Sequence, residues 1–266
     1  MISVKHLAIF SLITFISVFN LPVSYADEAV EKGLAIAKAA KARDEGWGDN
    51  TAQLTMTLRN KAGKETTRQM RVKSLEQTED GDMSMTIFDN PRDVAGTAFL
   101  SHTHVNTPDD QWLYLPALKR VKRIASKNKS GPFMGSEFAY EDLSSFEVEK
   151  YTYRWLRDEV YDGQDCYVLE SVPVDKYSGY TRQVAWIDKA EYRSLKIEFY
   201  DKRKTLLKTL TIGDYQQFLG KYWRPGLQQM VNHKTGKSTD IVMSDYQFGT
   251  GLSKNDFTEN SLKRAR

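Results

Sequence analysis

Residues 51–58 read TAQLTMTL, and this stretch sets the fold that the sequence predicts. Its larger apolar side chains occupy every second position, with threonine or glutamine between them. Successive side chains of a β-strand point to opposite faces, so this alternation predicts a strand with one apolar face. The same pattern surrounds Met70, Met85 and Ile197, and each of these segments is predicted to be a half-buried strand.

Short turn segments separate the predicted strands. They include NKAGKE (60–65), EDGD (79–82), DNPRD (89–93), YDGQD (161–165) and NHKTGKS (232–238). Such segments join neighbouring antiparallel strands, whereas parallel strands need long crossover connections. We count about eleven strands, and an antiparallel sheet of this size is expected to curl, split into layers or close.

Residues 27–43 have a helical period. Val30, Leu34 and Ala37 recur at spacings of three and four, and two acidic residues begin the segment at the positive end of the helix dipole. A single helix ahead of a large sheet can fill the curve of that sheet. The sequence therefore predicts a mainly β fold, a curved antiparallel sheet of about eleven strands wrapped around an N-terminal helix. We expect the tail NSLKRAR (260–266) to fray.

The N-terminus has the pattern of an export signal. Residues 7–23 are mostly apolar, and Ser24 and Ala26 are small residues suited to a cleavage site after Ala26. This predicts a cleaved signal peptide over residues 1–26 and one exported, soluble domain over residues 27–266. A retained membrane anchor is the alternative, although the apolar run is shorter than the roughly 20 residues that a spanning helix needs.

Composition excludes some classes of protein. The chain has 38 Lys and Arg residues against 35 Asp and Glu residues, and the predicted signal peptide contains one of the cations, Lys5. A nearly neutral balance argues against a general nucleic-acid binder. Cys166 is the one cysteine, so no internal disulfide can form, and we expect it to pack as a small apolar side chain.

The sequence shows no motif that predicts catalysis. It has no G-x-S-x-G nucleophile motif and no glycine-rich loop with phosphate-binding spacing. His102 and His104 would share one face of a strand, where His233 or Asp109 could complete a metal site. The alternative is a polar strand end before a turn. We expect no enzyme activity, no metal and no cofactor.

Methionine is frequent on the apolar positions of the first predicted strands. Its flexible side chain suits an apolar surface that accepts varied shapes, although ordinary core packing is the alternative. Eight residues are predicted to share the concave face of the sheet: Leu54, Met56, Leu58, Met70, Val72, Met83, Met85 and Ile87. With Trp112 and Tyr114, these ten residues are predicted to line an apolar cavity.

A cluster of cations follows the predicted strand DQWLYLP (110–116). Lys119, Arg120, Lys122 and Arg123 are predicted to form a basic rim on an edge strand, with aliphatic stems over apolar surface and charged groups in water. Transient contact with an anionic membrane is one interpretation. A solvated charged face is the alternative, and the local extent of the charge argues against nucleic acid.

The segment after this cluster places a Phe-Met pair between two glycines. Phe133 and Met134, with Phe138 and Tyr140, are predicted to form a lid or rim at the mouth of the cavity. SEFAYEDL (136–143) predicts a short helical turn. Bare apolar side chains rarely stay exposed in a soluble protein, so we expect the pair to face inward without cargo and to swing outward on delivery.

The assembled segments resemble the LolA/LolB-like outer-membrane lipoprotein-sorting proteins of Gram-negative bacteria. DQWLYLPALKRVKRI (110–124) with GPFMGSEFAYEDL (131–143) is the most specific part of the resemblance. YDGQDCYVLESVP (161–173) and the segments 183–210 and 222–248 follow in the expected order. The resemblance covers most of the predicted mature chain and is to the broad family rather than to its well-studied periplasmic carrier. It implies an unclosed antiparallel β-barrel, helices in its mouth and an apolar cavity for acyl chains.

The resemblance implies a periplasmic, non-enzymatic carrier. Such a protein binds acyl chains of lipoproteins or lipids and passes them between envelope membranes, or to and from a transporter. Members of the broad group also resemble companions of RND-type lipid exporters, so such an exporter is an expected partner. Two alternatives stay open: an adaptor of the exporter whose barrel is filled by side chains, and an envelope lipid hydrolase.

Overall fold

The structure is a computed structural model that describes residues 25–265. The predicted signal peptide, apart from its last two residues, lies outside the described residues. Helix α1 (Tyr25–Arg43) matches the predicted N-terminal helix, and a second helix, α2 (Glu259–Arg264), lies near the C-terminus. Within residues 25–265, no helix has both the length and the apolar character needed to span a membrane.

In the described part of the chain, thirteen strands form one antiparallel sheet, and two more form a separate hairpin. The strands of the main sheet are β1 (Asp49–Arg59), β2 (Glu65–Leu75), β3 (Met83–Asn90), β4 (Ala98–His102), β5 (Asp110–Leu115), β6 (Arg120–Arg123), β7 (Tyr151–Tyr161), β8 (Gln164–Pro173), β9 (Tyr180–Asp188), β10 (Ser194–Asp201), β11 (Leu206–Gly213), β14 (Leu227–Asn232) and β15 (Ser238–Phe248). The hairpin consists of β12 (Gln216–Phe218) and β13 (Tyr222–Arg224).

The order of the strands shows that the sheet is open. It runs β6-β5-β4-β3-β2-β1-β15-β14-β11-β10-β9-β8-β7, so two strands adjacent in sequence, β6 and β7, form its opposite edges. Their connection must therefore cross from one edge of the sheet to the other. It contains four short 3-10 turns: η2 (Ser126–Asn128), η3 (Phe133–Gly135), η4 (Tyr140–Leu143) and η5 (Val148–Lys150).

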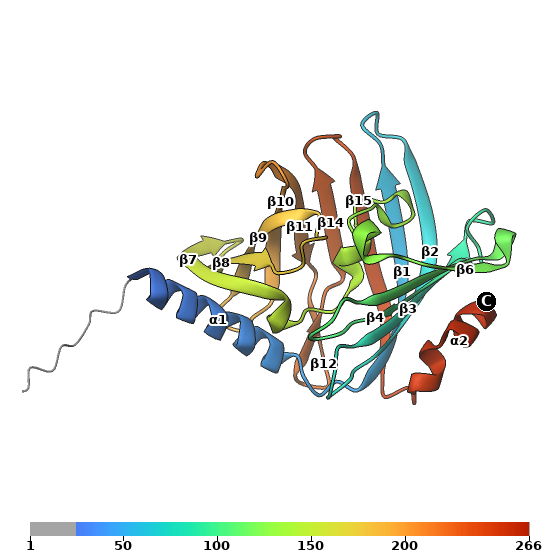
Figure 1. Cartoon of the computed structure of the whole chain (residues 1–266), viewed down its shortest axis with the longest axis horizontal. Coiled ribbons are helices and arrows are strands. Elements are labelled where there is room, and N and C mark those ends of the chain that lie inside the picture. Colours follow the sequence, from blue (N-terminus) through green and yellow to red (C-terminus); the bar gives the residue numbers. More distant parts are fainter. Residues whose placement is uncertain (1–24, 266) are drawn as a thin grey trace, which may run out of the picture.

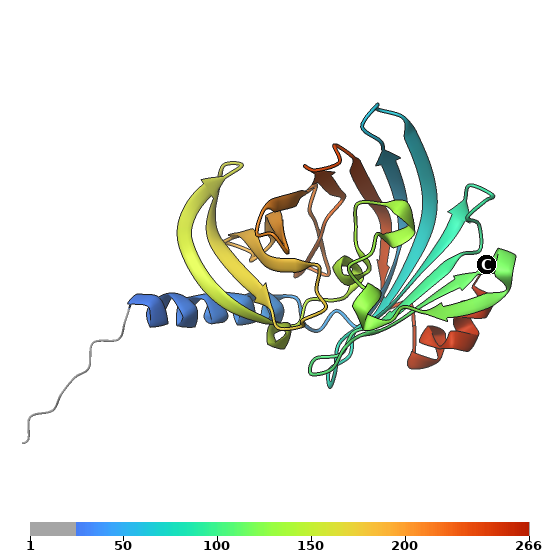
Figure 2. The same ribbon diagram turned by 45° about the horizontal axis from the view of Figure 1, so that its top comes forward.

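The sheet curves around this connection, as Figures 1 and 2 show. The side of the sheet that faces the connection is called the concave face here, and the opposite side the convex face. The predicted mainly β fold, with a curved, unclosed antiparallel sheet and an N-terminal helix, is confirmed. Within residues 25–265 the main sheet has thirteen strands rather than about eleven.

Helix α1 covers one end of the sheet. Ile36 and Ala37 are buried against Tyr153 of β7 and Leu169 of β8. The approach is close at Gly33, where an added Cβ atom would lie 2.7 Å from the backbone nitrogen of Trp155. Only glycine permits this contact between helix and strand backbones. The middle of the concave face is filled by the connection between β6 and β7 instead.

The C-terminal segment covers part of the convex face. Phe257, in the 3-10 turn η6 (Lys254–Phe257), and Leu262 of α2 are fully buried against β3 and β4. Thr258 caps α2 by accepting a hydrogen bond from the backbone N–H of Ser261 (3.1 Å). The expectation that residues 260–266 fray is therefore wrong for the described part of this tail, because Leu262 anchors it to the sheet.

Candidate functional site

The concave face of the sheet is apolar where β1, β2, β14 and β15 meet. Leu54, Met56, Leu58 and Met70 belong to one cluster that continues across the sheet to Met230. The pairing of Leu54 with Met70 places both side chains on the same side of the sheet. Four of the ten predicted lining residues thus lie together on the concave face, and their part in binding stays a prediction. Val72 shares their side by its position in β2, two residues from Met70.

The other five predicted lining residues lie on the convex face, so their predicted placement is wrong. They are Met83, Met85, Ile87, Trp112 and Tyr114, and they pack in the cluster that Phe257 and Leu262 cover. The register gives the reason, because Met85 pairs with Lys73 and Phe88 pairs with Met70. In β3 the residue that faces the concave side is therefore Phe88, which the sequence analysis did not select.

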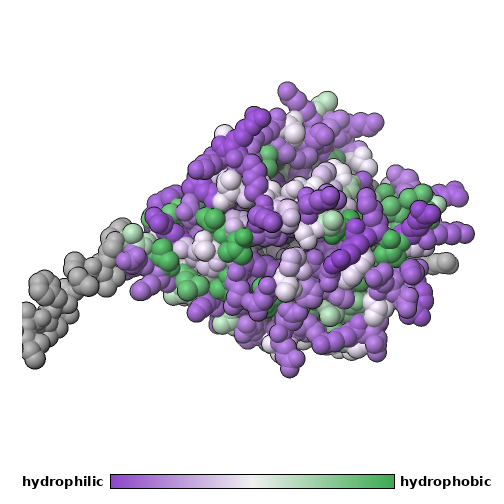
Figure 3. All heavy atoms as spheres, viewed as in Figure 1, coloured by the Kyte–Doolittle hydropathy of each residue, from purple (hydrophilic) through white to green (hydrophobic). Residues whose placement is uncertain are grey.

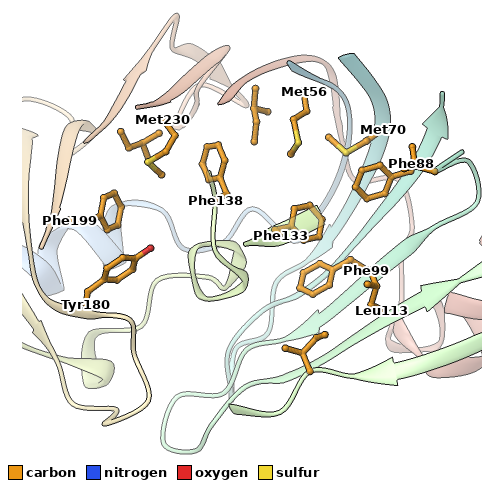
Figure 4. Close-up of a cluster of buried hydrophobic side chains, with 14 residues drawn as sticks. Met56, Met70, Phe88, Phe99, Leu113, Phe133, Phe138, Tyr180, Phe199 and Met230 are labelled. Carbon is orange, nitrogen blue, oxygen red and sulfur yellow. The ribbon is translucent and has the colours of Figure 1, made fainter. Parts of the chain in front are cut away.

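Residues 131–143, called the plug below, occupy the concave face. Phe133 is buried, with its ring centroid 5.8 Å from that of Phe88 and 5.2 Å from that of Phe99. Figure 4 shows Phe133 and Phe138 projecting from the plug among side chains of the sheet. Tyr140 packs edge-on against Phe133, with centroids 5.6 Å apart. The four predicted lid residues, Met134 among them, therefore face inward in this structure, and their movement remains a prediction.

A buried ion pair joins the plug to the sheet. Lys208 of β11 donates from Nζ to Asp142 Oδ2 (2.6 Å) and to the carbonyl of Glu137 (2.9 Å). Tyr180 of β9 donates its hydroxyl proton to Asp142 Oδ1 (2.8 Å). Both side chains of the ion pair are almost fully buried. Asp142 also accepts from the backbone N–H of Ala139 (2.7 Å) and so caps the predicted helical turn, which is η4.

Further polar contacts hold the middle and the C-terminal part of the plug. Glu137 accepts from Asn232 Nδ2 through Oε2 (2.7 Å), and its backbone N–H donates to Thr239 Oγ1 (3.0 Å). The Glu141 carboxylate accepts from the hydroxyl of Ser178 and the backbone N–H of Gly179, both at 2.7 Å. Burial raises the pKa of Glu141 above its ordinary value. Specific polar contacts thus hold the plug from its middle to its C-terminal part.

The tip of the plug has a strained backbone. Met134 adopts a φ angle of 50°, in the left-handed region that residues other than glycine rarely occupy. Arg68 of β2 donates from Nη1 to the Met134 carbonyl (2.6 Å), and burial lowers the pKa of this guanidinium. Strain of this kind persists where surrounding contacts hold it, and it is concentrated at sites that move or bind.

The plug does not cover the whole concave face. Six apolar residues of the surrounding strands pack against the concave cluster and stay partly exposed: Leu54, Leu58, Ile197, Leu207, Ile212 and Met243. A cavity of about 230 Å³ lies elsewhere, between α2 and the convex side of β2 and β3, with Met85, Ile87 and Lys73 in its lining. The predicted apolar cavity is therefore, in this structure, a concave apolar face with a plug seated in it.

The predicted basic rim lies on the edge strand β6 and on the residue before it. Lys119, Arg120, Lys122 and Arg123 are all exposed. Arg123 forms an ion pair with Asp110 of β5. The register of β6 on β5 places Arg120 and Lys122 on the side of Leu113 and Leu115, which is the concave side. The predicted edge position of this strand is confirmed.

The histidines have separate partners. His102 Nε2 lies 2.7 Å from the carbonyl oxygen of Phe257, and His104 Nδ1 lies 2.6 Å from Asp80 Oδ2. His233 Nε2 lies 2.8 Å from the Thr209 hydroxyl. Within residues 25–265, no three potential ligands are grouped closely enough to hold a metal ion.

Sequence reasoning missed the polar residues that hold the plug. Lys208, Leu210 and Ile212 are spaced by two residues and therefore share one face of a strand. A cation on this otherwise apolar face was a signal visible in the sequence. Its partners Asp142 and Tyr180 are distant in sequence and carry no pattern that links them to it. Cys166, in contrast, is buried as predicted.

Solved structures share this fold along most of their length. A domain from Vibrio parahaemolyticus, assigned to the outer membrane lipoprotein-sorting proteins, is 64% identical, with a TM-score of 0.87 over 88% of this chain and 100% of that one. A DUF1329 family protein from Desulfovibrio piger is 30% identical, with a TM-score of 0.83 over 88% and 99% of the two chains. A LolA superfamily protein from Nitrosomonas europaea is 22% identical and shares the fold, with a TM-score of 0.69 over 86% and 98%.

The chain thus shares its open, curved sheet with these three proteins, a LolA superfamily protein among them. A family model described as that of an uncharacterized protein matches residues 80–264. A comparison with curated proteins finds no match. The chain belongs to the LolA/LolB-like outer-membrane lipoprotein-sorting family, as the resemblance of its segments predicts.

Proposed function

We propose that this protein is a periplasmic carrier that shelters the acyl chains of lipoproteins or lipids on its concave face. The observation that carries the proposal is the seating of the plug. An apolar sheet face is covered by single turns and a strained backbone rather than by a regular element, and six apolar residues around it stay partly exposed. Such a covering segment can be replaced by another apolar chain at lower cost than a packed helix or strand.

Replacement of the plug by an acyl chain gains free energy from the burial of that chain. Each methylene removed from water contributes about 0.8 kcal/mol, so a long acyl chain supplies a binding free energy of the order needed to displace apolar side chains. The ligand replaces the contacts of Phe133 and Phe138 with the sheet, while the buried Lys208–Asp142 pair opposes the exchange. Opening therefore requires a ligand that offsets the loss of a buried ion pair.

A second candidate function is that of an adaptor for an RND-type lipid exporter. The observation in its favour is also the plug, because a concave face already filled by side chains needs no cargo. An exporter of this kind is equally the proposed partner of the carrier. The two functions differ in one measurable property, the binding of an acyl chain to the concave face.

The proposal contains no catalytic step. The buried Lys208 is engaged by Asp142 and a backbone carbonyl, which makes it a structural cation rather than a base. We expect phospholipids and lipoproteins to keep their ester and amide bonds on incubation with the protein. Steady release of product above that of a heat-inactivated sample is the result that would favour the hydrolase.

Two adjacent residues of β15 allow a matched test. Met243 faces the concave side and is partly exposed, whereas Val242 faces the convex side and is 49% exposed. We expect Met243→Lys to weaken the binding of a fluorescent fatty acid at least tenfold, because a buried cation opposes an apolar chain. Val242→Lys should leave the dissociation constant unchanged. Fluorescence titration gives both constants, and circular dichroism checks the fold.

Equal affinities for the wild-type protein and both variants would contradict binding on the concave face. Absence of any fatty-acid binding to the wild-type protein would favour the adaptor.

A further inference from the structure

The turn between β5 and β6 presents an apolar side chain to solvent. Leu118 is 63% exposed at the end of η1 (Pro116–Leu118). Pro116 begins this turn, and Lys119, at a φ angle of 48°, closes it with its backbone N–H donated to the Pro116 carbonyl (3.1 Å). A proline at one end and a left-handed residue at the other restrict the backbone. Leu118 is therefore held outward by a defined turn.

Cations surround this apolar tip. Lys119, Arg120 and Lys122 are exposed, and none of them forms an ion pair with another residue of the described chain. Arg123 pairs with Asp110, and Lys127 is a further exposed cation a few residues along the chain. A projecting leucine with several unneutralised cations around it has the composition of a site that meets an anionic surface.

The C-terminal helix extends the same surface. Ala265, which follows α2, packs in the convex cluster, and Figure 1 shows this end of the helix near the edge strand β6. Lys263 and Arg264 of α2 are exposed there. Figure 3 shows hydrophobic residues beside strongly hydrophilic ones at this end of the molecule, where Figure 1 places β6 and α2.

We infer that this surface, formed by the β5–β6 turn, β6 and α2, docks on an anionic lipid bilayer, with Leu118 inserted between the headgroups. A bilayer accepts a single projecting side chain without a shaped pocket, and the cations lie on both faces of the edge strand, as contact with a broad charged plane requires. An acidic protein partner would need a groove for Leu118. The inference identifies a membrane contact and does not depend on what the concave face binds.

Flotation tests this inference with two kinds of vesicle. One kind consists of phosphatidylcholine alone, and in the other about one lipid in three is phosphatidylglycerol. We expect binding to the anionic vesicles only, and weaker binding at high salt because exposed charges are screened over about 8 Å at physiological ionic strength. Leu118→Ser should weaken binding about tenfold through lost apolar burial. Arg120→Gln/Lys122→Gln should weaken it more than tenfold, at about fivefold for each cation.

The chain offers a matched control for each change. Leu219 is 67% exposed at the tip of the β12–β13 hairpin, and Lys202 and Arg203 are exposed in the β10–β11 turn. Leu219→Ser and Lys202→Gln/Arg203→Gln should leave flotation unchanged. No flotation of the wild-type protein would overturn the inference and favour an acidic protein as the occupant. Equal losses in test and control variants would overturn it in favour of general charge attraction. Neither result bears on fatty-acid binding by Met243→Lys.

Discussion

Asp82 lies immediately before β3, where three segments of the chain meet. Its Oδ1 atom accepts a hydrogen bond from the backbone N–H of Gln77 (3.2 Å), and the carboxylates of Glu76 and Glu147 are its neighbours. Burial, with a smaller contribution from these carboxylates, raises the pKa of Asp82 to about 6, although the cation of Lys41 opposes the shift.

The raised pKa of Asp82 predicts a pH dependence of stability. Well below the ordinary pKa of aspartate the group is protonated in both states and contributes nothing to the pH dependence. As the pH rises from 4 to 6, the unfolded carboxyl ionises while the folded one keeps its proton, so the native state loses stability. We expect Asp82→Asn to be more stable than the wild-type protein by about 2 kcal/mol at pH 7, after discounting for partial exposure. Urea unfolding of both proteins at several pH values measures this difference.

The difference between Asp82→Asn and the wild-type protein should be small at pH 4 and constant above pH 7. A difference that does not change between pH 4 and 7 would show that Asp82 titrates at its ordinary pKa.

At the scale of the element, a buried ion pair fixes the plug to the sheet. We expect Lys208→Met to lower the free energy of unfolding by about 3 kcal/mol, because it leaves the Asp142 carboxylate buried without its cation. The double variant Lys208→Met/Asp142→Asn should lose less than the sum of the single changes. Urea unfolding of the four proteins gives the coupling between the two residues.

Arg157→Met provides a comparison, since its ion pair with Glu159 is exposed and should contribute at most about 1 kcal/mol. Additive losses in the Lys208 and Asp142 variants would mean that the pair does not hold the plug.

The period of the sequence predicts which elements form but not which face each one presents. Alternation at Met83, Met85 and Ile87 correctly identifies β3 as a strand. Both faces of β3 carry apolar residues, since Phe88 lies on the other one, and alternation alone cannot tell which face is concave. The deciding facts are the pairing of Phe88 with Met70 and the cover supplied by Phe257, both contacts between residues distant in sequence.

The plug was predictable only in part. Its apolar residues stand out between glycines, and their inward position follows from the cost of exposing them. The polar contacts that fix the plug depend on the strand order, which brings β9, β11 and β14 around residues 131–143. No local pattern carries that information.

At the scale of the whole molecule, the open sheet separates two surfaces. Its two edge strands are consecutive in the chain, and so the segment between them lies on the concave face and becomes a covering for it. The basic edge strand β6 is joined directly to this segment. We propose that the membrane contact and the movement of the plug take place in adjacent segments of the chain, the first at β6 and the second at residues 131–143.

The methionines provide the most direct test of binding on the concave face. Five methionines lie in the concave cluster, namely Met56, Met70, Met134, Met230 and Met243, whereas Met83 and Met85 lie in the convex one. With methionine methyl groups labelled with carbon-13, NMR spectra before and after addition of oleate report which face is occupied. We expect shifted resonances for the five concave methionines and unchanged resonances for Met83 and Met85. Unchanged concave resonances at saturating oleate, or shifts confined to Met83 and Met85, would contradict it.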